Sequence, residues 1–245
     1  MLQSLSSALQ LMRYFTSTQP AWGVRELARE SGTHHAVVQR VLATFAAEGY
    51  LVQDAAGRYT LGLRWFEMGE IVRHVVSPTQ AVEPILQHLA RESGETVFLT
   101  LIDGNEGLCL DIVHSDQQLR FSIEEGQRFA LHAGSHGKAI LAFLPPEQRE
   151  GICANAARTD ARVDLAVLDG QLTQIRNQGW AYTREESAAG VAGLAVPVWS
   201  RTRQVVGSIA ISGPVQRLDE AAIPRLLAPL QLAQPKIEGV VGLLR

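Results

Sequence analysis

The sequence has only two cysteines, no long apolar run and little net charge. Cys109 and Cys153 stand in no CxxC motif and near no histidine at metal-ligand spacing, which argues against a disulfide framework and favours a reducing compartment. The lack of a run of roughly 18 apolar residues argues against a membrane-spanning helix. We therefore expect a cytoplasmic protein without membrane contacts.

The charge balance limits how the chain can bind a polyanion. Its formal net charge is −3 and its pI is about 6.2, which excludes attachment to nucleic acid by bulk positive charge. Residues 1–62 hold five arginines against four acidic residues, so this part is only slightly basic. Any binding to DNA must depend on locally placed side chains and, we expect, on dimerisation.

Residues 24–47 have the pattern of two helices joined by a tight turn. The first helix stops at Ser31-Gly32, where glycine can adopt the left-handed conformation of a helix C-terminus, and Thr33 can cap the second helix. In the second helix, four apolar residues at i, i+3, i+4 and i+7 form a stripe to be buried: Val38, Val41, Leu42 and Phe45. This layout is typical of a helix-turn-helix motif, and an ordinary corner of two packed helices is the alternative.

The opposite face of the second helix predicts a DNA-reading surface. Its residues are short, carry no charge except for one arginine, and can contact base edges or phosphates. They are Thr33, Ala36, Val37, Gln39, Arg40 and Thr44. On this face only Gln39 and Arg40 can donate hydrogen bonds from long side chains, so we expect them to make much of the contact with DNA.

Two further elements complete a winged helix. Before Gln19-Pro20, apolar residues repeat at helical spacing and predict an amphipathic first helix: Leu5, Ala8, Leu9, Met12 and Phe15. Residues 50–61 predict two short strands around an Asp/Gly turn. Arg58 beside this turn can reach a phosphate or the minor groove, and a solvated turn arginine is the alternative.

A helical run over residues 63–76 predicts a linker. Trp65, Phe66 and Met68 are large apolar residues for a connecting helix, so we expect them at a domain or subunit interface, with simple core packing as the alternative. Ser77-Pro78 can open the next helix. One face of that helix carries Val82, Ile85, Leu86 and Leu89.

The rest of the chain predicts an α+β domain with an antiparallel sheet. Short strands are expected over residues 96–102, 108–114, 118–123, 191–198 and 204–212, of which the first three form a meander. Helices are expected from Pro146, over 165–178 and over 219–244, where prolines can interrupt the last one.

Several blocks of sequence resemble the IclR family of bacterial transcriptional regulators, in the right order and along nearly the whole chain. The blocks are SLSSALQLMRYF, GTHHAVVQRVLATFAAEGYL, GRYTLGLR, LHAGSHGKAILAFLP, IRNQGWAYTREESAAGVAGLAVPV and VVGSIAISGP. The resemblance implies a winged helix over residues 1–62, a linker helix over 63–77 and a GAF-like effector-binding domain over 78–245. It also implies a homodimer or tetramer that represses or activates genes of carbon-compound catabolism.

Two departures from the family pattern affect the expected sites. At the start of the reading helix the family often has Ser-Thr, whereas Ala36-Val37 stand here, which removes two hydroxyl groups and offers contacts to thymine methyl groups. In the last strand, alternating serines of the family become Ala210-Ile211-Ser212, with one polar group lost. The operator is expected to be palindromic double-stranded DNA. The expected DNA-binding residues are Arg25, Thr33, His34, His35, Ala36, Val37, Gln39, Arg40 and Arg58.

A small-residue segment before an apolar helix predicts a carboxylate site. Residues 134–138, Gly-Ser-His-Gly-Lys, are expected to form a loop at the N-terminus of the helix KAILAFL, where backbone N–H groups can hold an anion. The segment is no Walker A loop, because His132 and Ala139 occupy positions that require Gly and Ser or Thr. A tight strand-to-helix connection is the alternative.

Carried over from the family, residues 183–186 border the effector cavity. One of Glu185 and Glu186 should face it and the other solvent, since neighbours on an extended segment point to opposite sides. One end of the cavity is then polar and the other apolar, which predicts a monocarboxylate with an apolar body, such as an aromatic acid, rather than a two-carbon acid. The expected effector-binding residues are Gly134, Ser135, His136, Gly137, Thr183, Glu185, Glu186, Gly193, Ala195, Ala210 and Ser212.

Catalytic, metal and cofactor sites are not expected. His34-His35 lack the i, i+4 spacing of a helical metal site, and neither cysteine lies in a nucleophile elbow or beside a histidine. We therefore expect an effector-responsive DNA-binding regulator rather than an enzyme. The alternative is a winged helix used for protein contacts, attached to a small-molecule-binding or catalytic domain.

Overall fold

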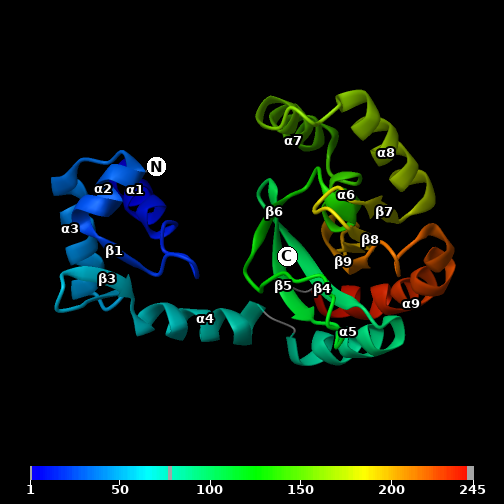
Figure 1. Ribbon diagram of the computed structural model, residues 1–245, viewed down its shortest axis with the longest axis horizontal. Coiled ribbons are helices and arrows are strands. Elements are labelled where there is room, and N and C mark those ends of the chain that lie inside the picture. The colour runs from blue at the N-terminus through cyan, green and yellow to red at the C-terminus, as the bar shows by residue number, and fades with distance from the viewer. Residues whose placement is uncertain (1, 77–78, 242–245) are drawn as a thin grey trace. The chain divides into compact units, whose positions relative to one another are not determined.

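A computed structural model (Figure 1) describes residues 2–76 and 79–241 of the chain. The chain separates into two compact units, Met1–Val76 and Ser77–Arg245. Each unit has a hydrophobic core of its own. The helix start expected at Ser77-Pro78 lies outside the described residues.

The first unit is a winged helix. Its elements in chain order are α1 Gln3–Met12, β1 Ala21–Gly23, α2 Val24–Ser31, α3 His35–Ala47, β2 Leu51–Gln53, β3 Arg58–Leu61 and α4 Leu63–Val76. The three strands form an antiparallel sheet in the order β1-β3-β2. The expected helix-turn-helix and two-stranded wing are confirmed, and β1 is an additional strand, too short to give an alternating sequence pattern.

The core of the first unit confirms one predicted stripe and corrects another. Val38 and Leu42 of α3 are fully buried, as their spacing predicts. The stripe predicted for the first helix is confirmed at its end, where Phe15 is buried and Met12 packs against the core. It is wrong at its start, because Leu5 and Leu9 are 53% and 47% exposed whereas Leu11 is 3% exposed. α1 carries two sets of apolar residues at helical spacing, and periodicity alone does not tell which set the core takes.

The turn between α2 and α3 ends at Gly32, whose φ of 65° is left-handed as expected. The expected capping of α3 by Thr33 is wrong. The N-cap is His34, whose Nδ1 accepts a hydrogen bond from the Ala36 N–H at 3.3 Å. Thr33 still belongs to the turn, where its N–H donates to Ser31 Oγ at 3.3 Å, so it stands one residue too early to cap the helix.

The large apolar residues of α4 have different environments. The Trp65 ring packs on aromatic residues of its own unit, with ring centroids 5.0 Å from Tyr50 and 6.4 Å from Phe45. Phe66 and Met68 are exposed. Core packing therefore applies to Trp65, and the interface expected for the other two residues stays a prediction.

The second unit is a six-stranded antiparallel sheet between two helical layers (Figure 1). The strand order is β6-β5-β4-β9-β8-β7, which confirms the expected α+β class. Its elements are α5 Thr79–Ser93, β4 Thr96–Asp103, β5 Glu106–Val113, β6 Arg128–Ala130, α6 Gly134–Leu141, α7 Pro146–Thr159, α8 Leu165–Gln178, β7 Ala181–Arg184, β8 Val191–Trp199, β9 Val205–Pro214, the 3₁₀ turn η1 Glu220–Ala222 and α9 Ile223–Val241.

Strand residues of the second unit alternate between two cores. Leu99, Val196 and Ile209 share a core with α5 and α9 on one face of the sheet. Phe98 and Ala195 face the other way, into a core formed with α6, α7 and α8. Every residue of α6 is buried, so this short helix is enclosed between the sheet and the outer helices.

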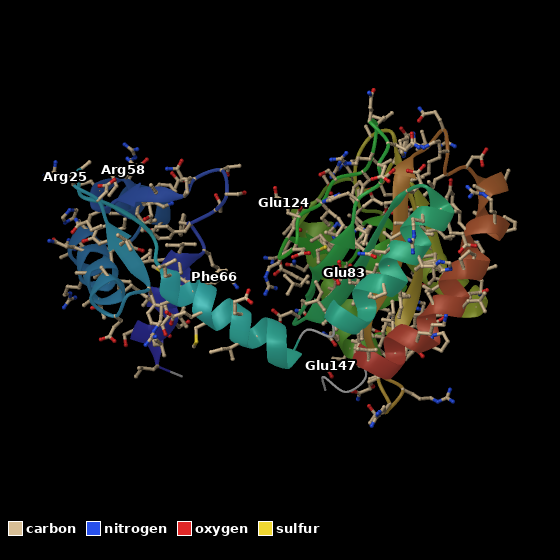
Figure 2. All side chains as sticks on the ribbon, turned by 90° about the horizontal axis from the view of Figure 1, so that it is seen from below. Arg25, Arg58, Phe66, Glu83, Glu124 and Glu147 are labelled. Atoms are coloured by element: carbon tan, nitrogen blue, oxygen red, sulfur yellow. The ribbon has the colours of Figure 1, made fainter. Side chains whose placement is uncertain are left out.

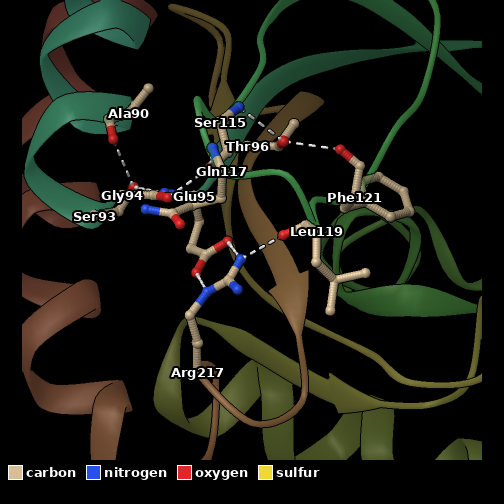
Figure 3. Close-up of polar contacts among 10 residues, drawn as sticks. All are labelled: Ala90, Ser93, Gly94, Glu95, Thr96, Ser115, Gln117, Leu119, Phe121 and Arg217. Carbon is tan, nitrogen blue, oxygen red and sulfur yellow. Dashed lines mark hydrogen bonds and ion pairs between the residues drawn. The ribbon is translucent and has the colours of Figure 1, made fainter.

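Residues 118–123 form an irregular segment and not the expected strand. Figure 3 shows side chains bonded to carbonyl groups that a strand would pair. Thr96 Oγ1 donates to the Phe121 carbonyl at 2.8 Å, and Arg217 Nη2 donates to the Leu119 carbonyl at 2.8 Å. The strand that pairs with β5 at this side of the sheet is β6.

Prolines do not interrupt the closing helix, contrary to the sequence pattern. Pro229 and Pro235 both lie inside α9, although each removes one backbone N–H donor. Leu230 and Ile237 of the same helix are fully buried in the core over the sheet. Packing therefore outweighs the lost hydrogen bonds.

Candidate functional site

α3 presents predicted DNA-reading residues at the surface of the first unit. Ala36, Gln39 and Arg40 are exposed. Thr33 and Val37 are half-buried, and together with Arg40 they border a groove of about 850 Å³ between α1 and α3. The freely accessible part of the surface is therefore narrower than the sequence pattern indicates.

Two histidines lie at the N-terminus of α3. His34 and His35 are both exposed. The His34 ring accepts the Ala36 N–H, which fixes its orientation at the helix start. Free N–H groups and the helix dipole make this end of a helix attractive to a phosphate, so the placement suits the predicted contact.

Arg58 is the first residue of β3, beside the turn of the wing, and its side chain is engaged within its own unit. Its Nη2 donates to the Ala21 carbonyl at 2.6 Å and lies 3.2 Å from Glu26 Oε2. In Figure 2, Arg58 and Arg25 lie at the same edge of the first unit. Arg58 thus joins the wing to the start of α2, and its predicted contact with DNA would need the guanidinium to bind a phosphate beside these partners.

In the second unit the small-residue segment is part of a helix. α6 begins at Gly134, with a φ of 77°, so residues 134–138 form the first turn of the helix and not a loop in front of it. Ala133 is the extended N-cap and offers no side-chain acceptor. The N–H groups of Gly134, Ser135 and His136 are therefore those that the helix itself leaves unpaired.

The structure brings four of the predicted effector residues together. Thr183, Gly193 and Ser212 are directly paired across β7, β8 and β9, so they share one face of the sheet. A Cβ atom added to Gly193 would lie 2.5 Å from Ser135 Oγ and 2.9 Å from Ser212 Oγ. The two hydroxyl groups converge over this glycine, below the first turn of α6.

The predicted apolar end of the pocket is closed. Ala195 and Ala210 pair with each other across β8 and β9 and are fully buried. They belong to the same core cluster as Ile140 and Leu141 of α6. Side chains of the protein occupy the space that the sequence pattern assigns to a ligand.

His136 and Gly137 help to fix α6 in place. The His136 ring makes edge contacts with Phe98 and Phe129, at centroid distances of 5.3 and 4.2 Å. Burial lowers the pKa of His136 to about 4, so the ring is neutral at pH 7. A Cβ atom on Gly137 would lie 2.8 Å from the Leu131 carbonyl oxygen, so only glycine permits this close approach.

A buried cation at α6 is the main feature that the sequence did not reveal. Lys138 is 4% exposed. Its Nζ forms an ion pair with Glu186 and donates to Gln171 Oε1 at 2.6 Å. The Gly134 N–H donates to Glu186 Oε2 at 3.4 Å. The only signal in the sequence is a lysine that stands directly before the apolar residues 139–144.

The side chains of Glu185 and Glu186 point to different partners, but not because they alternate along an extended segment. Glu185 has a φ of 56°, so the chain turns here and is not extended. Its Oε1 accepts the Gly190 N–H at 2.9 Å, which closes an exposed turn. Glu186 is directed to Lys138, so the two carboxylates face different partners.

Two cavities border this ion pair. One of about 500 Å³ lies between α6, α8, β7 and the start of α9, and is also lined by Trp180 and Tyr182. The other, of about 430 Å³, lies beside the starts of α6 and α8. Lys138, Gln171 and Glu186 line both cavities. A ligand in either cavity would therefore lie against these three polar side chains.

Comparison with known proteins identifies the architecture. The model of the IclR C-terminal domain of bacterial transcriptional regulators matches residues 73–238, and the IclR helix-turn-helix model matches residues 4–55. The chain belongs to the IclR family. The glycerol operon regulatory protein of Streptomyces griseus is 31% identical over 220 residues, which cover 89% of this chain and 87% of that protein.

Solved structures of IclR-family regulators share the fold. The regulator from Silicibacter sp. TM1040 has a TM-score of 0.87 and 25% identity, covering 98% of this chain and 96% of that one. An IclR homologue from Microbacterium hydrocarbonoxydans, crystallised with 4-hydroxybenzoate, has a TM-score of 0.78 and 21% identity, with coverage of 97% and 98%. The winged helix and the effector domain of this IclR-family chain are therefore those of DNA-binding transcriptional regulators.

The described residues lack two features of other protein classes. Within residues 2–76 and 79–241, every helix is too short or too polar to cross a membrane. The same residues contain no group of three or more His, Cys, Asp or Glu side chains arranged to hold a metal ion. Burial raises the pKa of the Cys109 thiol to about 12, so at pH 7 it is protonated and a poor nucleophile.

Proposed function

We propose that this IclR-family protein is an effector-responsive regulator of an operon for carbon-compound catabolism, acting in the cytoplasm and without catalytic activity. The observation that carries the proposal is the surface of α3, which exposes Gln39 and Arg40 on a winged helix. The name of the Streptomyces griseus relative, a glycerol operon regulatory protein, supports the catabolic role. The high pKa of Cys109 argues against a thiol enzyme.

Binding of DNA is proposed to depend on α3, on its N-terminus and on the wing. Gln39 and Arg40 are exposed and have the reach to donate to base edges or phosphates. The other members of the set contribute methyl groups, ring nitrogens or, at the wing, a guanidinium. The proposed residues are Arg25, Thr33, His34, His35, Ala36, Val37, Gln39, Arg40 and Arg58.

A gel-shift titration tests this proposal on the intergenic DNA upstream of the protein's own gene. We expect Arg40→Ala to weaken binding by about 1–3 kcal/mol, because one charged contact to DNA is lost. Arg29→Ala on α2, also an exposed arginine, is the matched control and should bind as the wild type does. Wild-type affinity of a folded Arg40→Ala protein would refute the assignment, as would an equal loss in the control.

The effector is proposed to be a monocarboxylate with an apolar body, such as an aromatic acid. Support comes from the polar groups at the start of α6 and from the aromatic wall of the larger cavity, formed by Trp180 and Tyr182. The Microbacterium relative carries 4-hydroxybenzoate in the same fold. Because Ala195 and Ala210 are closed off, the apolar body would need the cavity beside Lys138 or a movement of α6.

A thermal-shift panel of benzoate, octanoate and glyoxylate tests the class of effector. Binding to the folded state should raise Tm with the logarithm of ligand concentration. We expect benzoate and octanoate to stabilise the wild type more than glyoxylate does, and Ser135→Ala to reduce the effect. A preference for glyoxylate, or no dependence on Ser135, would show that the pocket has been misassigned.

A further inference from the structure

Lys138 is a buried cation whose counter-charge comes from a surface turn. A buried ammonium group is strongly destabilising unless a carboxylate or an equivalent group pairs with it. Glu186 supplies that group from residues 184–190, which connect β7 to β8 and include exposed residues 187–189. This turn has few buried side chains, so it can change conformation without disturbing the sheet.

Glu186 also occupies the start of α6. The same carboxylate that pairs with Lys138 accepts the Gly134 N–H at 3.4 Å, in the first turn of the helix. The first turn of α6 also holds a hydroxyl group, Ser135 Oγ, which is buried and has no hydrogen-bond partner among the described residues. The helix N-terminus and the Lys138 ammonium are groups that bind a carboxylate, and Ser135 Oγ lies on the sheet side of the same turn, over Gly193.

The surroundings leave space for a ligand at this point. Lys138, Gln171 and Glu186 are common to the cavities of about 500 and 430 Å³. The larger cavity adds Trp180 and Tyr182, which provide an aromatic wall for the body of an acid. A ligand in that cavity can pair its carboxylate with Lys138 by taking the position that the carboxylate of Glu186 now occupies.

We propose that Glu186 is an internal substitute for the effector's carboxylate and that the effector displaces it from Lys138. This inference rests on the proposed function. It adds that Lys138 is the cation that binds the acid and that residues 184–190 are the segment that responds to binding. In the ligand-free protein, Glu186 neutralises Lys138. In the bound protein, the monocarboxylate pairs with Lys138 and the Gly134 N–H. The turn at residues 184–190 then loses its contact with Lys138 and changes conformation, which distinguishes the bound state from the free one.

Competition of this kind has a measurable cost in affinity. A tethered carboxylate acts at a high effective concentration, so the free acid binds only to the fraction of molecules in which Glu186 has left. We expect Glu186→Gln, which keeps the size of the side chain and removes its charge, to bind benzoate at least about tenfold more tightly than the wild type. Glu147→Gln alters an exposed carboxylate of α7 that lines neither cavity, and should leave the dissociation constant unchanged.

Rescue of a truncated variant tests the site without knowledge of the natural effector. Glu186→Ala leaves Lys138 unpaired and opens space, so its Tm should fall below that of the wild type. Acetate or benzoate should then raise Tm by about 3–5 °C for each tenfold increase above the dissociation constant. Chloride at equal ionic strength and uncharged benzamide should not. Adding Lys138→Met to Glu186→Ala should abolish the rescue.

The outcomes separate the inference from the proposed function. Carboxylate rescue that requires Lys138, together with tighter benzoate binding by Glu186→Gln, establishes the site. The inference is overturned if carboxylates do not rescue Glu186→Ala, or if rescue persists in the double variant. It is also overturned if the wild type binds benzoate and Glu186→Gln binds it no more tightly. If the site is established but no acid changes operator binding by the wild type, the proposed effector response fails and the Lys138 site stands.

Discussion

Gly193 is the residue at which the sheet and α6 come closest in the second unit. Two serine hydroxyl groups converge on it, one from α6 and one from β9, at distances of 2.5 and 2.9 Å from where a Cβ would stand. Glycine therefore leaves room for hydroxyl groups that any other residue would displace. The space belongs to the polar end of the proposed effector site, so packing and binding are coupled here.

Gly193→Ala is expected to destabilise the second unit by about 1–3 kcal/mol, because the added methyl group forces Ser135 and Ser212 apart. It should also weaken binding of benzoate. Urea unfolding and thermal shift measure the two effects. Gly170→Ala is the control, since a Cβ there meets no atom within 4 Å and a helical glycine gains stability from alanine. Equal stability of the two variants would contradict the close approach.

His136 should make stability depend on pH. Burial lowers its pKa to about 4, from about 6.5 in the unfolded chain. Between these values the unfolded state binds a proton that the folded state does not, so the free energy of unfolding falls as the pH drops through this window. From pH 7 to pH 5 the loss should be about 2 kcal/mol.

Denaturant unfolding at pH 7 and pH 5 measures the contribution of His136. In His136→Gln the loss between the two pH values should be smaller than in the wild type by about 2 kcal/mol, because glutamine does not titrate. His88→Gln removes an exposed histidine of α5 and should leave the wild-type difference in place. The same pH difference in all three proteins would refute a buried, neutral His136.

Side chains of the candidate site were predictable only in part. The family resemblance indicated Ser135, Gly193 and Ser212, and the structure brings these three together. Lys138 was missed, because its carboxylate partner lies on a turn 48 positions later in the chain and no local pattern reports such a pair. Glu186 was indicated, but as a residue beside a cavity and not as the partner of a cation.

At the scale of elements, local patterns predicted most helices and strands, and tertiary contacts decided the exceptions. The stripes of α3 and α5 were recognisable because each has one apolar face, and Val82 and Leu86 of α5 are buried as expected. α1 has two such faces, so its sequence could not indicate which one is buried. Residues 118–123 have the composition of a strand, yet their carbonyl groups bond to Thr96 and Arg217.

The segment 114–127 is held by a side-chain network at the start of β4. Figure 3 shows Arg217 bonded to both carboxylate oxygens of Glu95 and to the Leu119 carbonyl. Ser115 Oγ donates to the Gly94 carbonyl at 2.7 Å. One arginine therefore neutralises a buried carboxylate and anchors the irregular segment at the same time.

Arg217→Ala should lower the free energy of unfolding by about 2 kcal/mol, because Glu95 stays buried without its cation. The loss is not larger because the arginine is partly exposed, so solvent already screens the ion pair. Amide hydrogen exchange within residues 114–127 should become faster. Arg128→Ala removes an exposed arginine that pairs with Asp103 and Glu106, and should cost less than about 1 kcal/mol. Unchanged exchange in the segment would show that Arg217 does not anchor it.

At the scale of the whole molecule, charge and exposed apolar surface both indicate self-association. A net charge of −3 leaves a single winged helix with little electrostatic attraction for DNA, so two copies on neighbouring half-sites would supply the affinity. α4 exposes a series of apolar side chains that a monomer would leave in water. They are Leu63, Phe66, Met68, Ile71 and Val72.

Phe66 is the sharpest test of assembly, because it is 66% exposed and Figure 2 shows it on α4 of the first unit. We expect the wild type to sediment as a dimer or tetramer at micromolar concentration and Phe66→Ser to shift toward monomer, with operator affinity at least about tenfold lower as the second winged helix is lost. Leu232→Ser on α9 removes a comparably exposed apolar residue of the other unit and should change neither property. A monomeric wild type that binds its operator fully would contradict assembly through α4.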